Sequence, residues 1–188
     1  MYGDAQTDPT PEDTLPRPIS PYGVTKLACE HLVSAYVSQL GIDALSLRYF
    51  TIFGPRQRPD MALARMIECL VEGRPFELFG DGAQSRSFTF VGDAVEATVL
   101  AMERGVTGAT YNVGGGEEVT MLEAIETLGG VAGRRLELVR TERREGDARR
   151  TAADSARIRD DLGWLPTTSF AEGLEAQWRW AADRVAAA

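Results

Sequence analysis

The chain has 188 residues, 44% hydrophobic and 26% charged, a composition typical of a globular protein and not of a disordered or fibrous one. The 20 basic and 28 acidic residues leave a net charge of −8, which disfavours binding to nucleic acid. No apolar run approaches the ~20 residues of a membrane span, and the first residues lack a basic and apolar leader. Two cysteines in apolar contexts, Cys29 and Cys69, are expected to be buried thiols, so we predict a cytoplasmic protein.

The first third of the chain predicts a loop, a helix and a strand. Residues 4–20 are rich in Pro, Asp and Thr and lack periodicity, which indicates a loop or arm. A helix is predicted from Pro21, which follows a serine N-cap, to the residue before Gly41. The apolar residues 44–50 predict a buried strand of a parallel sheet.

Helices and strands alternate along the rest of the chain. Capping boxes predict helices that begin near Thr120 and Ser169. Further helices are expected at 61–72, 93–103 and 155–162, and strands at 76–79, 86–91, 110–113 and 136–139. The alternation predicts an α/β fold, but the chain has too few long strands for a complete parallel sheet. We therefore expect the second half of a larger unit.

Tyr22 and Lys26 are the clearest candidates for catalytic residues in the sequence. They are four residues apart, so they share one face of the first predicted helix. An ammonium group one turn from a phenol favours the phenolate, and such a pair can move a proton to or from a substrate hydroxyl. The spacing alone equally suits a packed tyrosine and a solvated lysine.

The pair stands within a series of motifs that follow one another along nearly the whole chain. They are Tyr2, Gly3 and Asp4; Pro11 and Glu12; residues 20–26; residues 48–57; residues 79–82 with Gln84, Arg86 and Phe88; residues 111–114; Arg144 with Gly146 and Asp147; and residues 162–164. Together they resemble the extended short-chain dehydrogenase/reductase family. Within it they are most similar to the NAD-dependent nucleotide-sugar epimerases and dehydratases of the UDP-glucose 4-epimerase type.

The resemblance implies roles for five residues around the cofactor NAD. Tyr22 would be the acid/base on the sugar hydroxyl, and Lys26 would bind the nicotinamide ribose and tune Tyr22. Tyr49 and Phe50 would lie beside the nicotinamide. Thr51 stands where the family usually places an asparagine that contacts the substrate phosphate, so its shorter side chain is a departure from the pattern.

Four further residues are implied in binding the nucleotide. Phe79 would border the base, and Asp147 would hold the nucleotide ribose or its loop. Arg86 and Arg144 would hold the diphosphate, a role that suits the planar guanidinium group. The alternative for the two arginines is an exposed surface position.

The resemblance also implies a fold and a division of the chain. The fold would be the C-terminal part of a Rossmann-type parallel sheet plus a small α/β substrate-binding lobe. Residues 1–55 would be the remnant of the NAD-binding domain. Residues 56–188 would be mainly the substrate lobe, with strands and helices that return to the Rossmann sheet.

The implied reaction is NAD-dependent oxidation and reduction at C4 of a UDP- or dTDP-hexose, with a 4,6-dehydratase or decarboxylase as alternatives in the same class. No G-x-x-G-x-x-G loop precedes Tyr22, and the family's catalytic Ser or Thr would lie just before Tyr2. We therefore expect the chain alone to be inactive. The alternative is a non-catalytic nucleotide-sugar-binding or assembly module that completes a separate N-terminal half. The other partner predicted on this interpretation is a second copy of the chain, in a homodimer formed through the helix of Tyr22.

Other candidate groups favour structural roles. The single histidine, His31, is expected to be packed or to lie in an interface. One histidine and two scattered cysteines match no metal-site spacing, so no metal is predicted. The acidic cluster of Asp8, Glu12 and Asp13 is expected to be a solvated arm. The three tryptophans near the C-terminus are expected to pack rather than to stack on a sugar.

Overall fold

Helices and strands alternate along the chain, so the predicted α/β class is confirmed. The computed structural model describes residues 1–2, 9–142 and 150–186. The helices are α1 (Pro21–Leu40), α2 (Ala62–Glu72), α3 (Val91–Arg104), α4 (Met121–Ala132), α5 (Ala156–Leu162) and α6 (Phe170–Ala186). The strands are β1 (Ser46–Tyr49), β2 (Thr51–Phe53), β3 (Phe76–Phe79), β4 (Ser85–Phe90), β5 (Thr110–Val113), β6 (Glu118–Thr120), β7 (Leu138–Thr141) and β8 (Arg150–Thr151).

The structure corrects the prediction of one continuous strand over residues 44–50. The chain forms β1 there and then a separate strand, β2, and the two strands pair with different partners, β5 and β4. Phe50 lies between them, and its backbone N–H donates to the Val113 carbonyl at 3.0 Å. The short strands β6 and β8 were also not predicted, because two or three residues are too few to show an alternating pattern.

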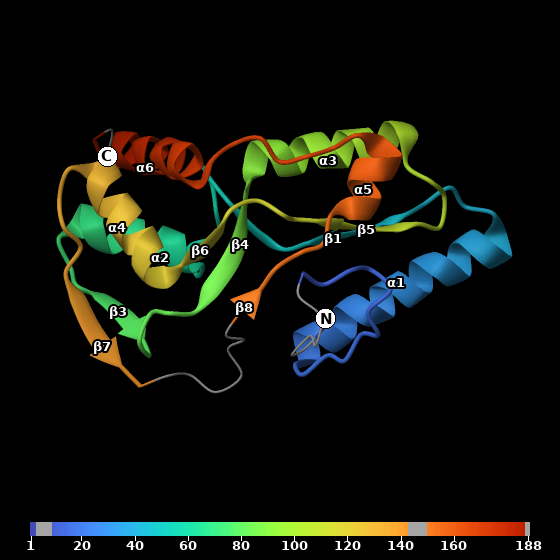
Figure 1. Ribbon diagram of the computed structural model, residues 1–188, viewed down its shortest axis with the longest axis horizontal. Helices are drawn as coiled ribbons and strands as arrows, with labels where there is room; N and C mark the ends of the chain where they lie inside the picture. The colour runs from blue at the N-terminus through green and yellow to red at the C-terminus, as the bar shows by residue number, and fades with distance from the viewer. Residues whose placement is uncertain (3–8, 143–149, 187–188) are drawn as a thin grey trace.

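The strands form three small groups, which are almost entirely parallel. β1 pairs with β5, β3 pairs with β7, and β4 pairs with β2 and β8, all in parallel. Only the β4–β6 pair is antiparallel among the strands described. Figure 1 shows β1 and β5 between α3 and α5 on one side and α1 on the other, whereas α2, α4 and α6 gather near β3 and β7. The layered part around β1 therefore has helices on both faces.

Two hydrophobic cores underlie this arrangement. One joins α2, α4 and α6 to β3 and to aromatic side chains of β2 and β4, such as Phe53 and Phe88. The other joins α3, α5 and β5 and contains Trp164, which is 1% exposed. The Trp164 indole N–H donates to the Asp93 carbonyl at 2.9 Å. This tryptophan therefore packs in the interior, as predicted.

α1 contributes little to either core. Its only buried residue is Gly23, and it ends at Gly41, which adopts the left-handed conformation at φ 64°. Five of its large side chains are more than half exposed: Tyr22, Val24, Leu32, Tyr36 and Leu40. Cys29 is exposed as well, so the prediction of its burial was wrong, whereas Cys69 is buried in the first core. No described part of the chain covers the faces of α1 that carry these residues.

A two-pronged ion pair fixes α1 to β1. The Arg48 Nε and Nη2 atoms on β1 each lie 2.8 Å from a carboxylate oxygen of Glu30 on α1. The side chains are only 11% and 16% exposed. Burial opposes the charged form of Arg48, but the hydrogen bonds to Glu30 and Tyr2 raise the pKa of its guanidinium above the ordinary value. The fold therefore holds Arg48 charged and uses it as a tie between helix and sheet.

The same arginine binds the first residues of the chain. Its Nη1 atom donates to the Glu12 carbonyl at 2.9 Å and to the Tyr2 hydroxyl. The Tyr2 hydroxyl in turn donates to Asn112 Oδ1 at 2.9 Å. Burial raises the pKa of Tyr2 above its usual value, with the hydrogen bond from Arg48 opposing the rise. Tyr2 is therefore held neutral, as a hydrogen-bonded bridge between β1 and β5.

Glu12 departs from the predicted solvated arm. Its side chain is 3% exposed, and its Oε1 atom accepts a 2.8 Å hydrogen bond from the Asn112 backbone N–H. The Asn112 side-chain amide donates to the Thr10 carbonyl at 2.9 Å. Because these partners satisfy the carboxylate inside the protein, the prediction was wrong for Glu12, whereas Asp13 is exposed and Asp8 lies outside the described residues.

Replacement by alanine should have opposite effects on stability at two helical glycines, Gly173 and Gly130. A Cβ at Gly173 on α6 would meet the rings of Phe53 and Phe90 at 2.6 and 2.7 Å, whereas a Cβ at Gly130 on α4 would meet nothing within 4 Å. We expect Gly173→Ala to lower the free energy of unfolding by about 1–3 kcal/mol through overpacking. Gly130→Ala should raise it by about 0.5–1 kcal/mol because alanine favours a helix. Denaturant titration measures both, and equal effects would contradict the packing.

Loss of Arg48 should uncouple α1 from the sheet. Arg48→Gln leaves the Glu30 carboxylate poorly paired in a nearly buried position, so we expect a loss of about 3 kcal/mol in the free energy of unfolding. The matched control is Arg58→Gln, which removes a pair with Asp60 whose side chains are 70% and 66% exposed. The control should cost less than about 1 kcal/mol. Similar losses in both variants would show that the Arg48–Glu30 pair does not anchor α1.

Candidate active site

A cavity of about 520 Å³ opens where α1 faces β1 and the first residue of β2. Five of the nine residues predicted for the site line it: Tyr22, Lys26, Tyr49, Phe50 and Thr51. The other described residues of its wall are Met1, Tyr2, Cys29, Glu30, Val33, residues 46–48 and Thr151. Ligands of parallel α/β sheets bind beyond the carboxyl ends of the strands, which is the position that this cavity has relative to β1.

Tyr22 and Lys26 lie at the beginning of α1 and face the same space. Ser20 caps this helix, since its side chain accepts a 3.1 Å hydrogen bond from the Gly23 N–H. The Lys26 ammonium lies 5.4 Å from the centre of the Tyr22 ring, and Tyr22 is 67% exposed. Within the described residues, neither the phenol nor the ammonium has a hydrogen bond or ion pair. Both groups can therefore bind the hydroxyl groups of a ligand.

Three consecutive residues form the opposite wall, at the break between β1 and β2. The Tyr49 hydroxyl lies 2.7 Å from Thr98 Oγ1 on α3, so its ring lies on the face of β1 opposite to Arg48, which contacts α1. The Phe50 ring packs against Tyr2, with centroids 6.2 Å apart. The Thr51 hydroxyl has no hydrogen-bond partner in the described part of the chain. The wall thus offers the Phe50 ring and one available hydroxyl, whereas the Tyr49 ring lies toward α3.

The residues predicted to bind the nucleotide lie farther along the fold. Phe79 ends β3, and Arg86 lies on β4, where its Nη1 atom donates to the Ser85 carbonyl at 2.7 Å. Neither is among the described residues that line the 520 Å³ cavity. Arg86 is in register with Thr151, which does line it, so this part of β4 borders the cavity. Arg144 and Asp147 lie outside the described residues.

Two residues of the cavity wall that fix its geometry, Glu30 and Arg48, have no role predicted from the sequence. Glu30 lies one turn beyond Lys26, and the recurrent spacing of four residues was a signal that it shares the face of Tyr22. Arg48 gave no such signal, because its contact with α1 depends on the tertiary fold. Their ion pair sets the distance between the helix that carries Tyr22 and the strand that leads to Phe50.

The described residues contain neither a metal site nor a membrane-spanning helix. No group of three or more His, Cys, Asp or Glu residues in this part of the chain is placed to hold a metal ion. His31 is exposed on α1, so it is not packed within the chain. No described helix is both long and apolar enough to span a bilayer.

Comparison with known proteins gives a consistent relationship. Residues 1–114 match the model of the NAD dependent epimerase/dehydratase family. The chain is 38% identical over 175 residues to the UDP-glucose epimerase YtcB of Bacillus subtilis, a protein itself uncharacterized, and the match covers 93% of this chain and 55% of that one. It is 36% identical to a dTDP-glucose 4,6-dehydratase of Neisseria gonorrhoeae, over 97% of this chain and 57% of the relative. The chain thus spans about half the length of the curated relatives it matches.

Solved structures show the same relationship in three dimensions. The UDP-glucuronic acid 4-epimerase of Bacillus cereus, in complex with UDP-glucuronic acid and NAD, is 39% identical and superposes with a TM-score of 0.92 over 97% of this chain and 59% of that one. The UDP-glucose 4-epimerase of Thermotoga maritima, with UDP-glucose, is 32% identical with a TM-score of 0.93, over 98% and 60%. The family predicted from the motifs is confirmed, and the chain belongs to the NAD-dependent epimerase/dehydratase family with its Rossmann-type α/β fold.

Proposed function

We propose that this chain is the part of a nucleotide-sugar 4-epimerase that carries the Tyr22–Lys26 pair. The substrate in this proposal is a UDP- or dTDP-hexose, and the reaction oxidises and then reduces its C4 atom. The observation that carries the proposal is the meeting of Tyr22, Lys26, Tyr49, Phe50 and Thr51 around one cavity. Similarity to epimerases of UDP-glucose and UDP-glucuronic acid supports the substrate class.

The chemistry of the cavity fits the nicotinamide riboside end of NAD. Lys26 offers an unpaired ammonium for the ribose hydroxyls, and Phe50 offers a ring face for the nicotinamide, with Tyr49 beside it at the end of β1. NAD, when bound, supplies the acceptor and later the donor of the hydride. Tyr22 takes the proton of the C4 hydroxyl during oxidation and returns it during reduction. Lys26, within 5.4 Å of the Tyr22 ring, stabilises the phenolate that forms.

Residues beyond the cavity complete the proposed substrate site. Thr51, with its available hydroxyl, contacts the substrate in place of the family's asparagine. We assign the base to Phe79 and the diphosphate to Arg86 and Arg144, with Asp147 at the nucleotide ribose. In this division α1, β1, α3, β5 and α5 belong to the cofactor domain, and α2, β3, α4, β7 and α6 to the substrate lobe. Free thiols favour the reducing cytoplasm as its compartment.

Tyr22→Phe tests the proposed acid/base. In an enzyme completed with the N-terminal part of the Bacillus cereus UDP-glucuronic acid 4-epimerase, this variant should lower kcat by about 10²- to 10⁴-fold, the usual contribution of a positioned acid/base. Binding of the nucleotide sugar, measured by titration calorimetry, should change little. Tyr36→Phe is the matched control, since Tyr36 is also exposed on α1 but lies outside the cavity. A Tyr22→Phe enzyme as active as this control would exclude the assigned role.

The 188 residues on their own are expected to bind substrate without turnover, because they span only about half the length of the curated relatives that they match. Calorimetry with UDP and, separately, NAD distinguishes the candidates. Binding of UDP alone supports a substrate lobe, and binding of neither supports the alternative of an assembly module. Turnover of UDP-glucose by the isolated chain would refute its inactivity.

Exposed apolar side chains on α1 favour a partner, either a second copy of the chain or a separate N-terminal half. Leu32 and Leu40 are 57% and 66% exposed. We expect the isolated chain to self-associate in light scattering, and Leu32→Glu to shift it toward the monomer because a charge cannot be buried there at low cost. Leu165→Glu, at a 52% exposed position away from α1, should have no effect. A monodisperse monomer of the unaltered chain would contradict this prediction.

A further inference from the structure

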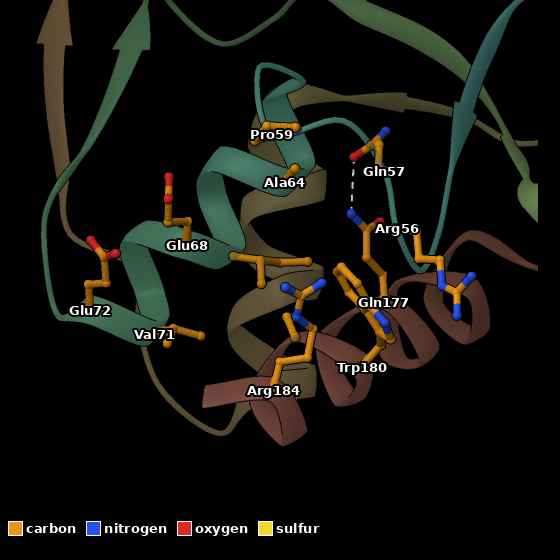
Figure 2. Close-up of a pocket in the computed structure, with 12 residues that line it drawn as sticks. Arg56, Gln57, Pro59, Ala64, Glu68, Val71, Glu72, Gln177, Trp180 and Arg184 are labelled. Atoms are coloured by element: carbon orange, nitrogen blue, oxygen red, sulfur yellow. Dashed lines mark hydrogen bonds between the residues drawn. The ribbon is translucent and has the colours of Figure 1, made fainter. Parts of the chain in front are cut away.

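A second and larger cavity lies between α2 and α6, away from the candidate active site. Its volume is about 1100 Å³, and none of its described lining residues also lines the cavity of Tyr22. Figure 2 shows α2 along one side, α6 along the other, and the turn that carries Arg56 and Gln57 at one end. The cavity exceeds the size that a small ligand requires.

The walls of this cavity are largely apolar. α2 contributes Ala64, Ile67 and Val71, and α6 contributes Trp180 and Ala181. Ile67 is 3% exposed and belongs to the first hydrophobic core, so it forms a firm floor. An apolar ring or chain bound here would be removed from water and would contact the apolar side chains of both α2 and α6.

Two guanidinium groups, of Arg56 and Arg184, place positive charge on the α6 side of the cavity, in a chain whose net charge is −8. Arg184 lies with its guanidinium 4.9 Å from the centre of the Trp180 ring, and Figure 2 shows it extending from α6 toward α2. In the described part of the chain, neither Arg184 nor Arg56 has a carboxylate partner. Such groups prefer anions with planar or branched oxygen atoms.

The carboxylates at the opposite end do not neutralise these arginines. Glu68 and Glu72 lie 3.9 and 2.5 Å from the guanidinium of Arg74, which follows α2. In Figure 2 both glutamates point away from α6. The positive charge at Arg56 and Arg184 is therefore available to a ligand.

The polar side chains at the remaining edge are already satisfied and shape the cavity. Gln177, 2% exposed, donates to Gln57 Oε1 at 3.0 Å and accepts from the Gly54 N–H at 3.0 Å. Gln57 donates to the Ile52 carbonyl at 3.0 Å. These bonds fix the turn that carries Arg56, so the arginine projects from a rigid base.

We propose that this cavity between α2 and α6 binds a small organic anion that contains an aromatic ring. The ring would lie against Ile67 and Val71, and the anionic group would bind Arg184, with Arg56 adding positive charge at the far end of the cavity beyond Trp180. Inorganic phosphate lacks the apolar body and should bind far more weakly. The proposal concerns residues outside the candidate active site and is independent of the proposed epimerase function.

The test uses 8-anilinonaphthalene-1-sulfonate as the probe and the three tryptophan indole N–H signals of a ¹⁵N-labelled chain as the readout. The probe should shift the Trp180 signal, assigned through Trp180→Phe, in a saturable manner. The signal of Trp164, which is 1% exposed under α3, should not move. Because the readout is local, it distinguishes binding of the probe in the cavity from binding of the probe to the apolar surface of α1.

Charge and shape controls make the test specific. Replacement of both guanidinium groups, in Arg56→Gln with Arg184→Gln, should weaken the Trp180-detected affinity about tenfold or more. Arg179→Gln should leave it unchanged, because Arg179 is exposed on the same helix and pairs with Glu175. N-phenyl-1-naphthylamine, the same ring system without the sulfonate, should bind the double variant and the unaltered chain equally.

Several results would overturn the proposal. These are a Trp180 signal that does not respond to the probe, an affinity that the double variant retains, or an equal response to inorganic phosphate. A Trp180 signal that changes with protein concentration in the absence of probe would instead identify a second copy of the chain as the occupant. If the probe binds as proposed, UMP and indole-3-acetate distinguish a nucleotide from an aromatic carboxylate as the source of the ring-bearing anion.

Discussion

The ion pair between Arg48 and Glu30 is the interaction on which the geometry of the candidate active site depends. α1 buries only Gly23, so hydrophobic packing within the chain gives it little hold on the sheet. The pair supplies that hold with two hydrogen bonds of 2.8 Å in a position nearly closed to solvent. Because Glu30 shares a helix face with Tyr22 and Lys26, the ion pair that fixes the helix also directs these two groups toward the break between β1 and β2.

The break between β1 and β2 has a similar double role. Up to Tyr49 the chain belongs to the layer of β5 and α3, and from Thr51 onward it pairs with β4 and enters the core of α2, α4 and α6. The cavity lies at this transition, where the backbone leaves one ladder for the next. Residues that would bind cofactor and substrate in the proposed reaction are therefore neighbours in sequence as well as in space.

Charge is distributed unevenly over this acidic chain. Arg48 is enclosed by hydrogen bonds to Glu30, Tyr2 and Glu12 and serves the structure, whereas Arg56 and Arg184 face a cavity without a carboxylate partner among the described residues. The tertiary surroundings of a guanidinium group, not its presence in the sequence, decide whether it stabilises the fold or remains available to a ligand. The apolar side chains of α1 that remain exposed are likewise available for contact with a partner. The chain is about half as long as its curated relatives.

The sequence by itself determined the features that depend on local chemistry. Helical spacing placed Tyr22 and Lys26 on one face, capping boxes placed the starts of α4 and α6, and the ordered motifs identified the family. The tertiary structure alone decided which groups distant in the chain meet: Arg48 with Glu30, and the buried Glu12 with Asn112, a hundred residues away. Periodicity and capping act over one or two helical turns, whereas such contacts depend on how strands pair and helices dock, which no short window of sequence records.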